Sequence, residues 1–475
     1  MLKKNFVKAL GLSLLLASQA QALTLDWSGG YRAEWTEVDR PSLDTPSQRK
    51  SYGLNYLYLS PKIIAADGIN ITSRFDILNS QQYPGSQLGT IWGFDGSTGA
   101  TDSSATNNNM GAAQVSISQL YLTINQEYGA LIVGRAPLDF GVGMAYSSGQ
   151  GAFDHWYDTR DLIAYKIVFG DWFLMPILTR SASTYEFGQG GSITAMGGLL
   201  QYENKENQSL IGVLMESKKG SMGALGYTPS QIAAYGGDAV SSGLSIQSTH
   251  FVLGRGFDGF AFKLEAGFLA GETGITRAGD DVGVNGYGIA AEIAFPRPES
   301  KWDFTAKFGM ATGDDPGTTD FDAYAFDQNY DVAMLMFNHR MGQKDFMNTN
   351  VYRPNTTPGG AAAGTMEGAD NSADDEYLSN AIYVAPSALY RWNDRFDVRN
   401  TLVWAQLMQT QKNSVDSSKD LGLEWDIELI YRPSDRIQWV NQVGLLFPGE
   451  AWKNGNDDFG NGFNFGFASK AAISF

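Results

Sequence analysis

Residues 463–475 read FNFGFASKAAISF, and this stretch decides the fold. The large apolar side chains of Phe465, Phe467, Ile473 and Phe475 alternate with small or polar residues. A period of two is the pattern of a β-strand that has one apolar face. The pattern continues to the last residue, an aromatic one. Such a strand is typical of barrels in the outer membrane of Gram-negative bacteria, and it predicts that architecture here.

The other end of the sequence has the pattern of a secretory signal peptide. Lysines precede a short apolar segment at Ala9–Ala17, and a small-x-small motif follows at Ala20–Ala22. We therefore expect residues 1–22 to be removed and residues 23–475 to form the barrel. The apolar segment is about half the roughly 20 residues that a spanning helix needs, which argues against an uncleaved anchor.

The composition narrows the function classes. Aromatic residues make up 13% of the chain, and 11 of them are tryptophans, as two interfacial girdles of a barrel would need. The absence of cysteine excludes disulfides, thiolate metal sites and thiol nucleophiles. A net charge of −17 excludes a basic footprint for nucleic acid. The excess acid fits solvated outer loops, a cation-favouring vestibule or divalent-bridged contact with lipopolysaccharide.

Turn-forming residues divide the chain into strands joined alternately by short and long connections. Gly, Pro, Asn and Asp mark the breaks, as tight turns require. The breaks predict eighteen strands in an antiparallel up-and-down barrel with short periplasmic turns and long outer loops. Sixteen is the alternative count, if the weak break at Gly188–Gly191 is a bend in one hairpin arm. The short breaks are Ala66–Ile69, Glu127–Ala130, Gly170–Trp172, Asn204–Gln208, Phe257–Gly259, Pro296–Lys301, Trp392–Arg395 and Arg432–Arg436.

Side-chain alternation supports these strands. In residues 69–77, for example, isoleucine and phenylalanine face one way while Arg74 and Asp76 face the other. In a barrel the apolar face meets lipid and the charged face meets a wet lumen. The predicted strands are 25–37, 52–65, 69–79, 114–127, 130–136, 161–169, 172–187, 192–204, 208–218, 243–256, 259–271, 282–295, 301–312, 379–392, 395–411, 420–432, 436–447 and 463–475.

Charged residues on the inward face are candidates for lining a pore. An eighteen-stranded barrel is too wide for its wall side chains to fill, so it leaves an aqueous channel unless loops fold in. Acid is in excess among the candidates, which predicts that cations pass more easily than anions. Opposite charges on neighbouring strands can also serve only to cross-link the wall. The candidates are Arg74, Asp76, Lys166, Lys263, Glu265, Glu292, Asp303, Lys307, Asp397, Arg399, Glu424, Asp426 and Glu428.

The segment Ala136–Arg160 is the best candidate for a loop that narrows the pore. Its glycines allow sharp bends against a wall, and its aromatic residues can pack there. Such a loop could set a transverse field across the lumen. The alternative is that it caps the outer mouth. Its charged candidates are Asp139, Asp154, His155, Asp158 and Arg160.

The longest insertion, residues 313–379, is an outer loop with an unusual apolar stretch at Val332–Phe337. An apolar stretch inside an outer loop is expected to be buried, folded into or over the mouth. Acidic residues of this loop could bind Ca²⁺, but their spacing does not match the calcium-loop pattern, so solvated carboxylates are favoured. These residues are Asp314, Asp315, Asp320, Asp322, Asp327 and Asp331.

An enzyme is not indicated. The chain has only three histidines and neither a nucleophile elbow nor a zinc-protease motif. The neighbouring residues Asp154 and His155 could form an acid/base pair, but adjacent residues rarely face one another. We therefore expect no catalytic residue, no metal and no cofactor.

Two segments resemble alginate-export-type porins. Asp420–Trp452 (DLGLEWDIELIYRPSDRIQWVNQVGLLFPGEAW) is similar to their C-terminal strands, and Gly313–Phe337 (GDDPGTTDFDAYAFDQNYDVAMLMF) is similar to a loop late in their barrel. The resemblance implies an eighteen-stranded monomeric barrel that passes a solute or polymer. The alginate exporter has an arginine-rich conduit, whereas the lumen candidates here are net acidic, so no substrate residue is carried over.

These patterns together predict an outer-membrane channel for diffusion of small hydrophilic solutes, mildly favouring cations. The alternatives are a substrate-specific or polysaccharide-export porin, and a surface adhesin or barrel hydrolase that uses the long loop. The expected partners are outer-membrane lipid, lipopolysaccharide and the barrel assembly machinery, which would read the strand ending in Phe475. The barrel is expected to be a monomer or a homotrimer.

Overall fold

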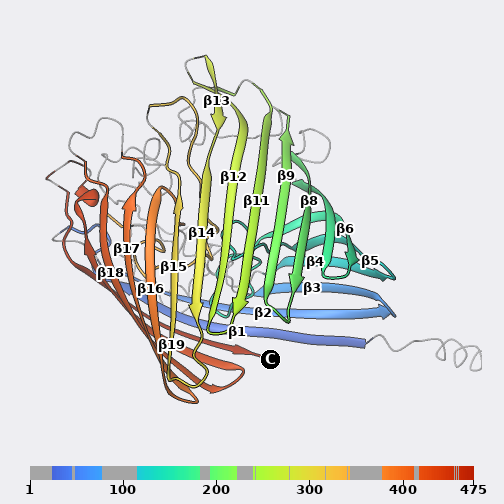
Figure 1. Cartoon of the computed structure of the whole chain (residues 1–475), viewed down its shortest axis with the longest axis horizontal. Coiled ribbons are helices and arrows are strands. Elements are labelled where there is room, and N and C mark those ends of the chain that lie inside the picture. Colours follow the sequence, from blue (N-terminus) through green and yellow to red (C-terminus); the bar gives the residue numbers. More distant parts are fainter. Residues whose placement is uncertain are drawn as a thin grey trace, which may run out of the picture.

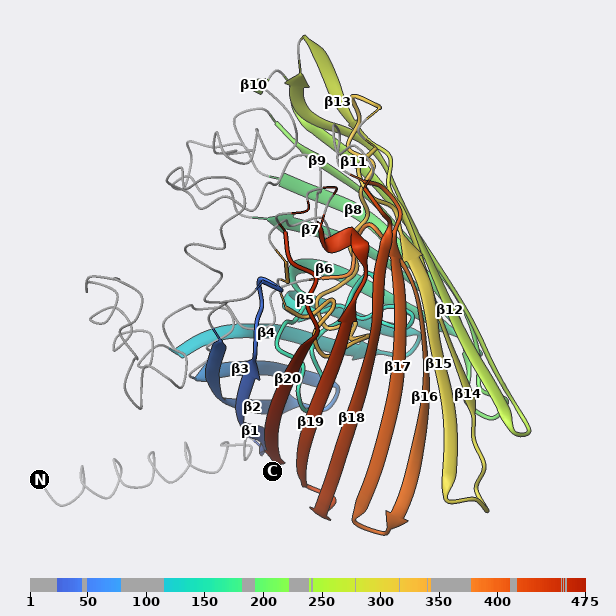
Figure 2. The same ribbon diagram turned by 90° about the vertical axis from the view of Figure 1, so that its left-hand side faces the viewer.

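The computed structural model forms one antiparallel sheet that closes on itself (Figures 1 and 2). It describes residues 24–44, 49–77, 115–181, 193–221, 239–240, 242–277, 279–315, 317–339, 341–342, 377–410, 417–453, 455, 457 and 459–475. The strands are β1 (Thr24–Val38), β2 (Lys50–Ala66), β3 (Ile69–Ile77), β4 (Val115–Gln126), β5 (Gly129–Pro137), β6 (Thr159–Phe169), β7 (Trp172–Ser181), β8 (Ile193–Asn204), β9 (Ser209–Gly220), β10 (Ala239–Val240), β11 (Leu244–Phe257), β12 (Phe260–Arg277), β13 (Asp280–Val284), β14 (Tyr287–Phe295), β15 (Trp302–Ala311), β16 (Ala381–Asn393), β17 (Phe396–Leu407), β18 (Asp420–Ser434), β19 (Ile437–Pro448) and β20 (Asn464–Ser474); a short 3-10 helix, η2, covers Glu450–Lys453.

Eighteen strands make up the wall, as the turns predict. β10 and β13 are short segments that pair with the outer end of β12, and Figure 1 shows β13 at the top of the wall. The remaining strands pair in chain order, and β1 pairs with both β2 and β20. The closed ring leaves no edge strand, so every wall strand has a partner on each side. The alternative count of sixteen is therefore wrong.

All eight predicted short turns join neighbouring wall strands at one end of the barrel. Gly68 and Gly170 adopt φ values of 74° and 62°, where a residue with a Cβ would be strained. The long connections begin and end at the other end of the barrel, and several of them fall partly or wholly outside the described residues. The gaps include 45–48, 78–114, 182–192, 222–238, 343–376 and 411–416.

The barrel closes where β1 meets β20. The two strands pair from Gly30 opposite Ser474 to Val38 opposite Gly466. Gly29 and Phe475 extend the ladder, since each backbone N–H donates to the other's carbonyl, at 2.9 and 3.0 Å. The terminal strand is therefore held along its whole length.

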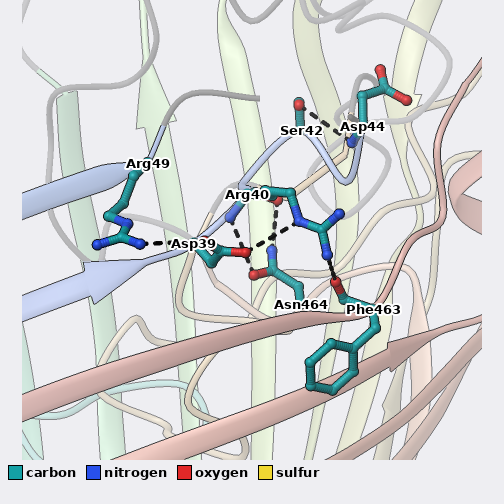
Figure 3. A network of polar contacts seen from close by, with 7 residues as sticks. All are labelled: Asp39, Arg40, Ser42, Asp44, Arg49, Phe463 and Asn464. Carbon is teal, nitrogen blue, oxygen red and sulfur yellow. Dashed lines mark hydrogen bonds and ion pairs between the residues drawn. The ribbon is translucent and has the colours of Figure 1, made fainter. Parts of the chain in front are cut away.

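A network of polar contacts stabilises the outer end of the junction between β1 and β20 (Figure 3). The buried side chain of Asn464 accepts from the backbone N–H of Arg40 at 3.2 Å and donates to the Arg40 carbonyl at 2.6 Å. The Arg40 guanidinium donates to the Phe463 carbonyl and, at 3.2 Å, to Asp39. The loop after β1 is thus joined to the segment before β20.

Asn464→Ala is expected to destabilise the barrel by about 1–3 kcal/mol, because two partly buried backbone groups of Arg40 lose their partners. The measurement is the temperature at which the folded band disappears on semi-native SDS electrophoresis. Ser474→Ala, at the other end of the same strand and with an exposed side chain, is the control. Equal unfolding temperatures for the two variants would contradict the prediction.

The wall carries its apolar side chains outward. Large outward residues such as Trp27, Phe304 and Val384 are 56%, 37% and 43% exposed, although they are apolar. Aromatic rings gather near the short turns, where Tyr128 and Trp392 are 69% and 62% exposed. An outward apolar band with an aromatic girdle needs lipid around it. Charged residues such as Glu34 and Glu265 are buried inside the ring.

Helices contribute little to the described part of the chain. No helix there is long and apolar enough to cross a membrane.

The predicted strand 259–271 ends too early, so the loop expected between it and the predicted strand 282–295 is wrong in part. β12 continues to Arg277 and forms a hairpin with β13. The alternation of apolar side chains stops where the wall leaves the membrane. Backbone hydrogen bonds between strands do not need this alternation, so the strand continues. The predicted strand 282–295 is also interrupted, because Asn285 donates its N–H to Phe321 of a loop instead of to a neighbouring strand.

Candidate functional site: two loops inside the barrel

The first inner loop, residues 138–158, joins β5 to β6 and crosses to β12. The Glu265 carboxylate on β12 accepts the backbone N–H groups of Val142, Met144 and Ala145 at 2.8, 3.2 and 3.0 Å. Glu265 is fully buried. A turn inside the lumen leaves backbone donors unpaired, and this wall carboxylate satisfies three of them.

The same loop is fastened to the opposite part of the wall. His155 Nε2 lies 2.8 Å from Glu34 Oε1 on β1, and the Tyr157 hydroxyl donates to Asp76 on β3 at 3.1 Å. The Arg32 guanidinium donates to the carbonyl of Asp154. A loop held by β1, β3 and β12 at once lies across the lumen.

The loop is also braced from within. Asp139 accepts from the backbone N–H and the hydroxyl of Ser148 at 2.7 and 2.6 Å. Leu138 and Phe140 are buried in an apolar cluster with wall residues of β6 to β11, among them Leu162. The first inner loop thereby fills the side of the lumen next to β6–β11, so a passage for solutes must lie on another side.

The second inner loop follows β15 in the chain and precedes β16. Its described residues are 312–315, 317–339 and 341–342. Its stretch Val332–Phe337 is buried, as its apolar character predicts. Glu424 on β18 accepts the N–H groups of Leu335 and Met336 at 2.6 and 2.8 Å, and Asp426 accepts that of Met334 at 3.0 Å. The wall therefore holds both loops by the same means, carboxylates bound to backbone donors.

The two inner loops meet at Asn329. Its side chain accepts from the N–H of Trp156 at 3.0 Å and donates to the Trp156 carbonyl at 2.6 Å. Nearby, the Asp327 N–H donates to the Met144 carbonyl at 2.7 Å. The carboxyl groups of Asp327 and Asp158 interact with each other at this contact. The loops thus form one body inside the ring.

Burial and, to a smaller extent, repulsion by Asp158 together raise the pKa of Asp327 to about 8, although a hydrogen bond from the Asn329 backbone N–H acts in the opposite direction. Burial also raises the pKa of Asp158. The positive charge of Arg160 lowers this pKa, whereas the negative charge of Asp139 raises it. Because the pKa of Asp327 lies above its ordinary value of 3.8, its contribution to docking is complete below about pH 4 and is lost as pH rises through about 8.

The contact between the inner loops is therefore expected to loosen between pH 7 and 9, seen as more frequent current fluctuations in single-channel records. Asp327→Asn keeps a neutral side chain at all pH values and is expected to abolish this pH dependence. Asp315→Asn, on the same loop away from the contact, is the control. A wild-type record that is the same at pH 7 and pH 9 would contradict the prediction.

Two cavities remain between the inner loops and the short-turn end. Cavity A, about 450 Å³, lies beside residues 149–152. Its charged lining residues are Arg32, Arg74, Arg432, Arg436 and Asp435. Cavity B, about 530 Å³, lies beneath residues 331–333. Its charged lining residues are Arg255, Lys263, Glu292, Asp303, Lys307, Asp331, Arg399, Asp426 and Glu428.

The thirteen wall candidates fall into three groups. Those that touch an inner loop or its immediate neighbours are Arg74, Asp76, Glu265, Glu424 and Asp426. Those that line cavity B are Lys263, Glu292, Asp303, Lys307, Arg399 and Glu428. Those near the short turns are Lys166, whose ammonium lies 4.0 Å from the centre of the Phe173 ring, and Asp397, which pairs with Arg432 at 2.5 Å.

The five loop candidates have equally definite places. Asp139, Asp154, His155 and Asp158 belong to the first inner loop, and Arg160 at the start of β6 pairs with Glu216 at 2.5 Å. Contact of any of these residues with a solute stays a prediction. Within the described ranges, no three acidic or histidine side chains form a group that could hold a metal ion.

Sequence reasoning missed Arg32 and Glu34, which form a buried ion pair at 3.0 Å. The signal was present, because both alternate with the outward residues Tyr31, Ala33 and Trp35. Asn329 was also missed, and no pattern in the sequence marks it, since its partner Trp156 lies far away in the chain.

No protein-family model matches the chain, and no curated protein matches it either. Solved structures of porins match over nearly the whole length. OccK11 (OpdR) of Pseudomonas aeruginosa shares 6% identity at a TM-score of 0.50, covering 95% of this chain and 96% of that one. OprD of the same species shares 9% at 0.48, covering 95% and 93%. An anion-selective porin of Comamonas acidovorans shares 10% at 0.42, covering 95% and 100%.

At these identities the similarity shows the fold alone. The resemblance to the alginate-export type is not confirmed, since the fold alone is shared with OccK11. The porin fold and the outward apolar band place the chain in the outer membrane of a Gram-negative bacterium.

Proposed function

We propose that the protein is a channel through which small hydrophilic solutes cross the outer membrane by diffusion. The observation that carries the proposal is that two wall-anchored loops fill part of the lumen and leave charged cavities of about 450 and 530 Å³. Cavities of this size and polarity suit hydrated small molecules. Width and charge select the solute, and passage involves no reaction step.

Swelling of liposomes that contain the purified barrel tests this proposal. We expect swelling in small sugars and a steep loss of rate as the sugar grows, because the inner loops leave only part of the lumen open. Empty liposomes give the background. No swelling above that background with any solute would overturn the proposal.

The mild preference for cations stays part of the proposal. Cavity B supports it, because carboxylates outnumber cationic groups among its lining residues by one, counting Asp426, whose carboxylate also binds a backbone N–H of the second inner loop. Cavity A favours a second candidate, a channel selective for an anionic solute. Four arginines and one aspartate line it, and three of these arginines, Arg32, Arg74 and Arg432, also pair with a wall carboxylate. The reversal potential in a salt gradient separates the two, since its sign reports which ion permeates faster. Saturable block by one sugar or oligosaccharide would instead favour the substrate-specific or polysaccharide-export alternative.

We also retain the proposal that the barrel assembly machinery reads the terminal strand. Phe475 supports it, because its ring is 52% exposed while its backbone is already paired with Gly29. Whether the barrel works as a monomer or a homotrimer is measured by its mass in detergent.

A further inference from the structure

One row of polar residues crosses the outward face at the outer ends of β5 to β12, where it ends in Ser245 and Glu272. The pairings place Arg135 opposite Asp161, Arg180 opposite Thr194, and Thr194 opposite Lys219. The pair Leu162–Thr179 places Asp161 next to Arg180. Because residues of one parity share a face, Arg180 lies on the side of the exposed Leu178, and Lys219 on the side of the exposed Met215.

This row differs from the middle of the outward surface. On β15, β17 and β19, for example, the outward positions between the two strand ends hold no ionised side chain. An ionised residue facing lipid costs about 2–4 kcal/mol at the middle of the bilayer and close to none at its edge. The row therefore marks the level at which the wall enters the outer headgroups.

The charges in the row are unequally compensated. Arg135 and Asp161 form a two-pronged ion pair at 2.7 and 2.9 Å. In the part of the chain that the structure describes, Arg180 and Lys219 have no ion-pair partner. Both are exposed, and the hydroxyl-bearing Thr194 lies between them on β8. Strands lie about 4.8 Å apart, so the two cations are on the order of 10 Å from each other.

We propose that Arg180, Thr194 and Lys219 form a binding site for the phosphoryl groups of an outer-leaflet glycolipid. Two cations and a hydroxyl at headgroup level match a phosphorylated sugar in charge and in hydrogen-bonding type. Arginine and lysine supply the donors, and the apolar residues below the row, such as Leu178 and Met196, contact the acyl chains. The pair Arg135–Asp161 bounds the site on one side.

Native mass spectrometry of the full-length barrel with diphosphoryl lipid A tests this site. Arg180→Gln combined with Lys219→Gln is expected to lower the apparent lipid affinity at least about tenfold, since each lost contact is charge-assisted. Arg255→Gln is the matched control, because Arg255 is an exposed cation at the short-turn end of β11. A heat-modifiability assay verifies that each variant is folded.

Three results would overturn the proposal. They are wild-type affinity in the double variant, an equal loss in Arg255→Gln, and equal binding of dephosphorylated lipid A by the wild type. Loss of a barrel oligomer in the double variant would instead assign the row to contact between copies. Channel conductance of the double variant is expected to equal that of the wild type, so this test is independent of the proposed channel function.

Discussion

Glu265→Ala raises the single-channel conductance severalfold, if the first inner loop is what narrows the passage. The substitution removes the acceptor of three backbone N–H groups, those of Val142, Met144 and Ala145. Each buried donor left without a partner costs about 1–3 kcal/mol, so the docked loop loses much of its hold on β12. The contacts to β1 and β3 remain, so the loop is expected to swing rather than detach.

The control for this experiment is Asp397→Ala. Asp397 is also an inward carboxylate, on β17, but its ion pair is with Arg432 at 2.5 Å and not with a loop, and it lines neither cavity. Planar-bilayer recordings of both variants and the wild type provide the comparison. A folded Glu265→Ala barrel with wild-type conductance would show that the first inner loop does not limit the current.

The second large effect is expected from Glu424→Ala combined with Asp426→Ala. These carboxylates accept the N–H groups of Met334, Leu335 and Met336, so their removal leaves three buried donors unpaired. The apolar side chains of Val332–Phe337 still pack against the wall, so the loop is expected to remain in the lumen. The folded state of the variant then has a higher free energy than that of the wild type. We expect a loss of at least about 3 kcal/mol in stability, since each unpaired donor costs about 1 kcal/mol or more.

The unfolding temperature in detergent measures this loss. Glu428→Ala is the control, since Glu428 lies on the same strand and pairs with Arg399 at 3.0 Å without bonding to a loop backbone. An unfolding temperature of the double variant equal to that of Glu428→Ala would contradict the assigned role of the two carboxylates.

The wall could be predicted from the sequence because its rules are local. Alternation places Trp302 and Phe304 outside and Asp303 inside wherever the strand lies in the barrel. Turn residues mark the short connections in the same way. The end of β12 was misjudged because GETGITR lacks alternation, yet it still pairs with β10 and β13.

The inner loops could be predicted only in part. The buried position of Val332–Phe337 follows from its apolar character. The meeting of Glu265 with residues 142–145 does not, because about 120 residues separate them and no local pattern records their contact. Such contacts also weaken the predicted preference for cations. Glu265, Glu424 and Asp426 are among the predicted pore-lining carboxylates, but they bind backbone N–H groups instead of facing open water.

The most direct measurement uses the absence of cysteine in this chain. Ala152 lies on the first inner loop and lines cavity A, whereas Val384 faces lipid on β16. We predict that a negatively charged thiol reagent lowers the single-channel current of Ala152→Cys and leaves that of Val384→Cys unchanged. If mass spectrometry shows that Ala152→Cys is fully modified while its current is unaltered, the water path does not run past the loop, and the account is contradicted.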